Sequence, residues 1–269
     1  MPVLDLARAC HPQPTAAVTV LTTALFAAAG DAATTCLLGA FAVLTGQLSI
    51  GWNNDLIDRQ RDLRAGRFDK PTVDGRLSAE LLRGVTAAAV LLTVPLSLAL
   101  GWLPGLLHLT AVGAGWLYNH WLKFTPLSVL PYLVAFGLLP IIATTALPEP
   151  RLPPAPVVLA AMLVGVAAHF ANVLPDLAGD LVTGVRGLPQ RIGLAGSVAV
   201  AALACLAATG LVLLVRNNWL TWFGLAAVAA AVLLALRLAV LRRVRAVFTA
   251  IIGCAALDVA LIVASGGLR

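Results

Sequence analysis

The feature that most constrains this fold is a series of long apolar stretches, separated by short segments rich in proline, glycine and charge. Several stretches run for roughly 18 or more residues, and a helix of that length crosses a hydrocarbon core of about 30 Å. Charged residues make up only 11% of the chain, far below the quarter or so that is usual in soluble proteins, and the mean hydropathy is +0.95. The sequence therefore predicts an all-α, polytopic membrane bundle.

The boundaries of the spans follow from the positions of proline, glycine and charge, and they give nine expected membrane helices. The first is treated as a retained span rather than a cleaved signal, because many spans follow it and no cleavage site is evident. All of them are expected to belong to one domain, residues 1–269. The expected spans are 14–30, 34–54, 78–101, 104–121, 126–147, 156–175, 194–215, 218–237 and 246–265.

Positive charge is distributed unevenly over the segments between these spans. With the N-terminus placed in the cytoplasm, fifteen of the eighteen Lys and Arg residues fall on the cytoplasmic side. Such a bias is typical of membrane topology, so the net charge of +6 needs no nucleic-acid partner. We therefore expect a multi-pass protein of the cell membrane, in contact with its lipids, with the C-terminus outside. The three residues expected outside are Arg151, Arg216 and Arg269.

Acidic residues are scarce and gather in two regions of the expected cytoplasmic side, which hold seven of the twelve Asp and Glu. Residues 54–62 read N-D-L-I-D-R-Q-R-D and residues 172–180 read N-V-L-P-D-L-A-G-D, so both contain N-x3-D-x3-D. Four expected spans separate them, which returns both motifs to one face with the same chain direction. This arrangement resembles a parallel internal repeat.

Each motif is expected to form a column of oxygen atoms, because positions i, i+4 and i+8 lie on one face of a helix. Like charges at this spacing repel one another, so a cation is expected between them. Oxygen ligands without His or Cys at matching spacing favour Mg²⁺, which commonly shares its coordination shell with a substrate phosphate. The two columns are Asn54, Asp58 and Asp62, and Asn172, Asp176 and Asp180.

Cationic residues lie in the same segments and could hold the oxygens of a diphosphate, although membrane topology alone also explains their charge. An enzyme that ionises an allylic diphosphate must stabilise the departing group and keep water from the carbocation. An apolar tunnel within a helical bundle would provide the second condition. The cations are Arg67, Lys70, Arg76, Lys123, Arg186 and Arg191.

Four short patterns together carry a family resemblance that covers nearly the whole chain. They are N-D-x-x-D-x-x-x-D at 54–62, D-K-P at 69–71 with Gly75 in the same loop, Y-N-H-W-L-K at 118–123, and D-x-x-x-D at 176–180 followed by G-x-R at 184–186. The sequence thereby resembles the UbiA superfamily of intramembrane prenyltransferases, which are nine-helix bundles with two Asp-rich motifs on cytoplasmic loops. The first motif with its trailing D-K-P is the specific part of this match.

The resemblance implies a Mg²⁺-dependent transfer of a prenyl group from an isoprenyl diphosphate to an aromatic or other lipophilic acceptor within the membrane, with release of diphosphate. It implies that the metal ligands are Asn54, Asp58, Asp62, Asp176 and Asp180, to which we add the paired Asn172, and that the four aspartates are the catalytic residues. The expected diphosphate contacts are Lys70, Lys123, Arg186, Arg67 and Tyr118.

The chain departs from the family pattern at two places. The spacing from Tyr118 to Lys123 is one residue longer than the Y-x3-K often found in the family, and Ala178 stands where many relatives have another acid. Because of Ala178, the second motif is expected to offer fewer acidic ligands to a metal ion. Two polar residues inside spans are left with open roles: His169 could face the cavity or pack between helices, and Asp258 should pair within the bundle or line the cavity.

Three other functions compete with prenyl transfer. A terpene cyclase of the same superfamily would act on the prenyl diphosphate with water or no acceptor. An ion-coupled transporter would carry its acids near the membrane midplane, whereas here they gather at one face. An enzyme that transfers phosphoalcohols also uses Asp-rich helices, but its D-G-x2-A-R pattern is missing from this sequence. The identity of the acceptor and the length of the prenyl chain are left open.

Overall fold

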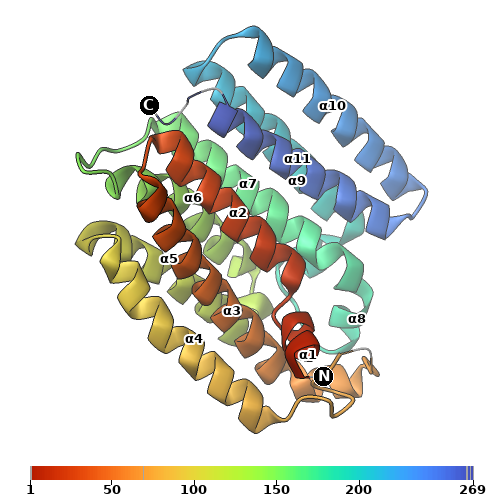
Figure 1. Cartoon of the computed structure of the whole chain (residues 1–269). Coiled ribbons are helices and arrows are strands. Elements are labelled where there is room, and N and C mark those ends of the chain that lie inside the picture. Colours follow the sequence, from red (N-terminus) through yellow and green to blue (C-terminus); the bar gives the residue numbers. More distant parts are fainter. Residues whose placement is uncertain (1, 69, 265, 267, 269) are drawn as a thin grey trace.

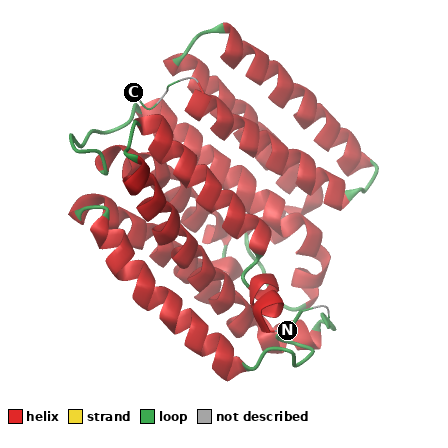
Figure 2. Cartoon of the chain, viewed as in Figure 1, coloured by secondary structure: helices red, strands yellow, loops and turns green. Residues whose placement is uncertain are grey.

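The apolar stretches form nine long α-helices in the part of the chain that the structure describes, a computed structural model covering residues 2–68, 70–264, 266 and 268. Shorter helical segments occupy the connections, and no strand occurs within these residues (Figures 1 and 2). The long helices are α2 Pro12–Ala29, α3 Ala33–Arg64, α4 Ala79–Ala99, α5 Trp102–His120, α6 Leu130–Thr145, α7 Ala155–Val173, α9 Leu188–Val215, α10 Trp219–Val240 and α11 Val244–Ala264. The short ones are α1 Pro2–Ala9, η1 Leu122–Phe124, η2 Pro126–Val129, η3 Leu174–Asp176 and α8 Leu177–Val182.

Seven helical stretches within the described residues are long and apolar enough to cross a membrane, which makes the chain an integral membrane protein. These stretches contain α3, α4, α6, α7, α9, α10 and α11. Helices α2 and α5, with 18 and 19 residues, pack among them in the same bundle. The predicted all-α membrane bundle is therefore confirmed, while nine remains an approximate number of spans.

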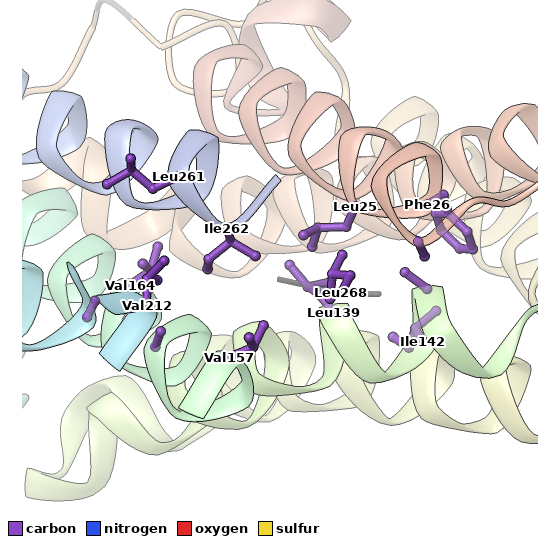
Figure 3. Packing of buried hydrophobic residues seen from close by; sticks show 14 of the residues in the cluster. Leu25, Phe26, Leu139, Ile142, Val157, Val164, Val212, Leu261, Ile262 and Leu268 are labelled. Atoms are coloured by element: carbon purple, nitrogen blue, oxygen red, sulfur yellow. The ribbon is translucent and has the colours of Figure 1, made fainter. Parts of the chain in front are cut away.

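Helices that follow each other in sequence pack as neighbours, and α11 closes the bundle against α2, α7 and α9 (Figure 1). The largest apolar cluster lies where α2, α6, α7, α9 and α11 converge, and Figure 3 shows its side chains pointing toward one another. Small residues permit close approach: a Cβ on Gly39 would lie 2.5 Å from the ring of Phe26, so α3 can press against α2 only because a glycine is there.

The two ends of the bundle carry different segments. Helix α1, the loop after α3 and α8 lie at one end, and the C-terminus lies at the other (Figure 1). At that other end the guanidinium of Arg151 donates to the carbonyl oxygens of Ala29 at 3.1 Å and Leu268 at 3.2 Å, which joins three segments far apart in sequence. The predicted sorting of the N-terminal segment and both acidic motifs to one end, away from Arg151, matches this arrangement.

Helix α3 runs ten residues beyond the predicted end of its span at residue 54. Its 32 residues make a rod of about 48 Å at 1.5 Å per residue, longer than a hydrocarbon core of about 30 Å. The extension contains the first acidic motif and ends with Arg61 and Arg64 in its last turn, where cations are favoured by the helix dipole. The first motif is therefore on a helix that emerges from the membrane.

The second motif does not lie on one continuous helix, which corrects the predicted column. Helix α7 ends at Val173, a 3₁₀ turn follows over Leu174–Asp176, and α8 is a separate short helix. Pro175 lacks the N–H that a continuing α-helix needs, and this explains the break. The last predicted span, 246–265, ends at Ala264 in the structure, and residue 265 lies outside the described residues.

An additional helix, α1, packs against α3 near Gly51 and Trp52 and was not predicted. The indole Nε1 of Trp52 donates to the carbonyl oxygen of Leu6 at 2.9 Å. A Cβ on Gly51 would lie 2.4 Å from the carbonyl oxygen of Cys10, so the turn between α1 and α2 rests directly on the backbone of α3. The N-terminal segment is thus packed one turn before the first acidic motif.

Candidate active site

The first motif presents buried carboxylates at the end of the bundle that carries α1 and α8. Asp58 and Asp62 lie one helical turn apart on α3 and are only 9% and 7% exposed. Asp55, which precedes them, is 2% exposed. Three carboxylates buried within two turns require nearby positive charge, since like charges at this spacing repel each other.

Asp58 is bound by two cations from different elements. The Nζ of Lys123, in the turn η1 after α5, lies 2.6 Å from Asp58 Oδ1, and Arg61 forms an ion pair with the same oxygen one turn along α3. Lys123 is itself 4% exposed. The ring of Phe124 lies beneath both cations, 5.1 Å from the Arg61 guanidinium and 5.5 Å from the Lys123 ammonium. The turn η1 therefore places the buried ammonium group of Lys123 in direct contact with the first motif.

Lys70 joins the other two carboxylates of the first motif. Its Nζ lies 2.9 Å from Asp55 Oδ1 and 2.8 Å from Asp62 Oδ2. His11, at the start of α2, also reaches Asp55, with Nε2 3.1 Å from Oδ1. The loop after α3 thus returns over the helix end and places the lysine of the predicted D-K-P signature on the motif. Asp69, the first residue of that signature, lies outside the described residues.

The two buried lysines differ in how their surroundings act on them. Burial lowers the pKa of Lys123, and although Asp58 opposes this, the nearby cations Arg61 and Lys70 add to it, so the pKa lies below its ordinary value. Burial also acts to lower the pKa of Lys70, but Asp55 and Asp62 outweigh it and raise the pKa above its ordinary value. The difference arises because Lys70 has two carboxylate partners and Lys123 has one.

The second motif meets the first through an arginine. The Nη1 of Arg67 lies 3.4 Å from Asp176 Oδ1 and 4.0 Å from Asp62 Oδ1, so one guanidinium stands between a carboxylate of each motif. The Asp176 side chain is 49% exposed. Asp180, one turn later on α8, accepts a hydrogen bond of 2.8 Å on Oδ2 from Nε2 of Gln190 in α9.

Aromatic side chains lie directly beside the two motifs. The rings of Tyr118, Tyr132 and His169 form a triangle, with centroid separations of 5.4 Å, 5.8 Å and 4.8 Å. Tyr118 lies close enough to Asp58 and Asp180 to be affected by their charges, and Tyr132 lies near the side chain of Asn172. The predicted pair Tyr118 and Lys123 therefore both reach the site, because α5 ends at His120 and the turn η1 absorbs the extra residue of spacing.

The amides at the start of each motif have protein partners. Asn54 Nδ2 donates to Asn119 Oδ1 of α5 at 3.0 Å, and Asn119 in turn donates to the carbonyl oxygen of Ile50 at 2.9 Å. Asn172 lies near Tyr132 of α6. In both cases the amide lies against a neighbouring helix. Its remaining hydrogen-bonding positions are left for another group.

The oxygen atoms of the two motifs fit a hard divalent cation that takes part of its shell from elsewhere. The carboxylates come from α3, η3 and α8, and three cations already lie against them: Lys70, Lys123 and Arg67. Within residues 2–68, 70–264, 266 and 268, no three acidic, His or Cys side chains lie close enough together to hold a metal ion by themselves. A Mg²⁺ ion here would need oxygens from water or from a phosphate group.

Sequence patterns located most of these residues but missed several partners. Arg61, Gln190 and the acceptor Asn119 were not predicted. For Arg61 the i, i+3 spacing from Asp58 was an available signal. Gln190 is ten residues from Asp180 but across a loop, and Asn119 is 65 residues from Asn54. Arg186 is exposed, and within the described part of the chain its side chain makes no ion pair.

The sequence left the roles of His169 and Asp258 open, and the structure places these two residues in different parts of the bundle. His169 Nε2 lies 3.1 Å from the hydroxyl of Ser128 at the edge of the site. Asp258 is fully buried in α11 and accepts a hydrogen bond of 2.5 Å from Thr209 of α9. Asp258 therefore pairs within the bundle and belongs to the packing of α9 against α11.

Several solved structures share the fold of this chain over nearly its whole length. A UbiA homologue from Aeropyrum pernix K1 superposes with a TM-score of 0.75 at 19% identity, over 91% of this chain and 97% of that one. A digeranylgeranylglyceryl phosphate synthase gives 0.73 at 16% identity over 98% of both chains. A UbiA homologue from Archaeoglobus fulgidus bound to GPP and Mg²⁺ gives 0.70 at 16% identity, over 96% of this chain and 97% of that one.

At these identities the structural likeness establishes the fold alone. No curated protein matches the sequence. Residues 16–257, however, match the UbiA prenyltransferase family, a range that includes both acidic motifs and all the long helices except the ends of the first and last. The predicted resemblance is confirmed, and the chain belongs to the UbiA prenyltransferase family.

Proposed function

We propose that this protein is a Mg²⁺-dependent prenyltransferase that moves a prenyl group from an isoprenyl diphosphate to a lipophilic or aromatic acceptor within the membrane. The observation that carries the proposal is the meeting of the two acidic motifs at one end of the bundle, with Arg67 between Asp62 and Asp176. Related structures support it, because UbiA homologues from Archaeoglobus fulgidus bind GPP or DMAPP together with Mg²⁺.

The metal would be held by the carboxylates of Asp58, Asp62, Asp176 and Asp180, with the amides Asn54 and Asn172 beside them. Bound Mg²⁺ neutralises the charge that develops on the departing diphosphate. Each carboxylate lies within one or two helical turns of another, so the set can orient a diphosphate bound between the two motifs.

The cations of the site suit the remaining diphosphate oxygens. Lys123, Lys70 and Arg67 converge on the carboxylates from three separate segments, so a diphosphate bound there meets positive charge from several directions. Arg186 lies on the exposed loop after α8 and would contact the diphosphate from the open side. Burial of Lys123 and Lys70 makes their charge more effective than it would be in water.

The residues on the membrane side of the motifs suit the organic part of the substrate. The faces of Tyr118 and Tyr132 carry negative electrostatic potential, which stabilises a nearby allylic cation, and the apolar helices behind them exclude water. The acceptor would approach through the same lipid-embedded region. We also infer that this end of the bundle faces the cytoplasm, because most Lys and Arg residues lie there.

The test is to measure transfer from a labelled prenyl diphosphate, of graded chain length, to a panel of aromatic and lipid acceptors with purified protein and Mg²⁺. We expect Asp58→Asn and Asp176→Asn to lower turnover at least a hundredfold, because each removes a charged ligand. The matched control is Glu80→Gln, an exposed carboxylate at the start of α4 near the same end. Undiminished turnover of both motif variants, in folded protein, would refute the proposal.

The same assay separates the alternative within the family. A terpene cyclase would consume the prenyl diphosphate without any acceptor and release a hydrocarbon or alcohol, which mass analysis identifies. An ion-coupled transporter, the alternative from another class, would require flux in proteoliposomes that depends on Asp58 and Asp176. The position of these residues at the end of the bundle favours the enzyme over the transporter.

A further inference from the structure

Helix α8 carries Asp180 but is attached to the bundle by few contacts. It has six residues, and none of them is buried. The carboxylate of Asp180 nevertheless has a defined partner, because Oδ2 accepts the 2.8 Å hydrogen bond from Nε2 of Gln190. Gln190 is 7% exposed and lies in the first turn of α9. The backbone of α9 has a kink at Gly193, where φ is 73°, so Gln190 lies in the short helical segment before this kink. A buried amide therefore connects the least supported part of the site to the beginning of α9.

The beginning of α9 is fixed in turn against the loop that carries Lys123. The backbone N–H of Leu188 donates to Ser128 Oγ at 2.9 Å, and the same hydroxyl lies 3.1 Å from Nε2 of His169 on α7. A Cβ on Gly187 would lie 2.9 Å from the carbonyl oxygen of Lys123, so the two backbones are almost in contact. The distance between Lys123 and Gln190 is thus set by direct packing.

This packing couples the two acidic motifs. Lys123 holds Asp58 of the first motif, Gln190 holds Asp180 of the second, and both come from one contiguous block of structure. The choice of an amide matters, because a neutral donor can orient a carboxylate without cancelling the negative charge that a metal ion requires.

We propose that Gln190 is a positioning residue of the metal site, which fixes the orientation of the Asp180 carboxylate through its Oδ2 so that this carboxylate would be held ready for a metal ion. The inference rests on the proposed function, which assigns Asp180 to the metal. Groups that hydrogen-bond to a metal ligand typically change metal affinity or activity by 10–100-fold when they are removed. Gln190 would act through Asp180 and would not touch the substrate.

The experiment measures Mn²⁺ binding by electron paramagnetic resonance in the presence of inorganic pyrophosphate, on the full chain in detergent micelles. Gln190→Met keeps the length and volume of the side chain and removes the donor. We expect the Mn²⁺ dissociation constant to rise about tenfold. The Mg²⁺ concentration for half-maximal prenyl transfer should rise by a similar factor, while turnover at saturating Mg²⁺ stays within a few-fold of wild type. Gln13→Met, at an exposed position of α2, is the control and should change neither quantity.

A double-mutant cycle separates positioning from a general structural role. In an Asp180→Asn background, Gln190→Met should have little further effect on Mn²⁺ affinity, because the group through which it acts is already altered. An unchanged Mn²⁺ affinity in Gln190→Met, or an equal loss in both backgrounds, would overturn the positioning role while leaving the proposed function intact. Failure of the wild-type protein itself to bind Mn²⁺ would overturn the metal-dependent function and this inference together.

Discussion

Single residues in this protein carry charge in places where charge is costly. Lys123 is the clearest example: its ammonium is buried and lies 2.6 Å from a buried carboxylate, at a turn between two membrane helices. Removing one partner of such a pair leaves the other without full compensation, which is why buried pairs are sensitive to mutation. Function and stability are therefore both affected by the same contact.

Replacement of Lys123 by Met tests its role at the residue scale. We expect prenyl transfer to fall by about 10–100-fold, the equivalent of one charge-assisted hydrogen bond of roughly 1.5–3 kcal/mol. Arg83→Met, an exposed cation of α4 near the same end, should leave transfer unchanged. Steady-state kinetics on the two purified variants provide the comparison, and equal rates would show that Lys123 does not contact the reacting group.

Asp31 gives a pH-dependent prediction at the opposite end of the bundle. Neither of its buried carboxylate oxygens has a hydrogen-bond partner within the described chain, and burial raises the pKa to about 6, although Arg151 nearby opposes the rise. The folded state thus retains a proton that the unfolded state releases near pH 4. The resulting stability is present at low pH and is lost as the pH rises from about 4 through 6.

Asp31→Asn should abolish that loss, because an amide does not titrate. We expect the variant to match wild type near pH 4 and to unfold at a higher temperature above pH 6, as measured by thermal unfolding in detergent. Glu149→Gln, an exposed carboxylate of the loop before α7, serves as the control. A wild-type midpoint with the same pH dependence as the variant would contradict the prediction.

At the scale of elements, the site depends on how α3, α8, α9 and the turn η1 are placed relative to one another. Helix α3 projects beyond the membrane, and α8 is separated from α7 by the break at Pro175. Gly187 lies where the start of α9 meets η1, and the absence of a side chain allows this contact. Its backbone is extended, so the requirement for glycine is one of space rather than of conformation.

Gly187→Ala should disturb this junction. The added methyl would lie 2.8 Å from Gln190 Oε1, 2.9 Å from the Lys123 carbonyl oxygen and 2.9 Å from Ser128 Oγ, so the start of α9 must shift. We expect at least a tenfold loss of transfer. Gly84→Ala, in the interior of α4 with open space around it, should instead be neutral or stabilise the protein by up to about 1 kcal/mol. Activity and melting temperature of the two variants distinguish these outcomes.

At the scale of the whole molecule, topology decides from which side the substrates reach the site. The acidic motifs and α1 lie at one end of the bundle, while Arg151 and Leu268 lie at the other. The excess of Lys and Arg at the first end predicts that it faces the cytoplasm. The prediction of a single domain built from two repeated halves also belongs to this scale and stays a prediction.

Cysteine labelling tests the orientation. In a background in which the four native cysteines are replaced, Glu80→Cys and Glu149→Cys place one exposed thiol at each end of the bundle. A membrane-impermeant maleimide added to intact cells should label the cysteine at 149 and spare the one at 80, and inverted vesicles should show the reverse pattern. Labelling of the cysteine at 80 in intact cells would show that the site faces outside.

The sequence by itself determined the all-helical membrane fold, the approximate spans and the two acidic motifs. These features are local: a run of apolar residues fixes a span by its length, and the N-x3-D-x3-D pattern is visible within nine residues. The helical spacing of Asp58 and Asp62 followed for the same reason. The repeated pattern predicted a continuous helix through Pro175, but proline lacks the N–H that such a helix needs, and α7 ends at Val173.

Only the tertiary structure decided which cations and amides meet each carboxylate. Asp58 and Lys123 are 65 positions apart, Asn54 and Asn119 are also 65 apart, and the hydrogen bond between Gln190 and Asp180 requires the loop between α8 and α9 to fold back. No spacing rule connects such pairs, because the packing of whole helices brings them together. The position of a charge along a helix is set by its own segment, but its partner is set by which other segments pack against it.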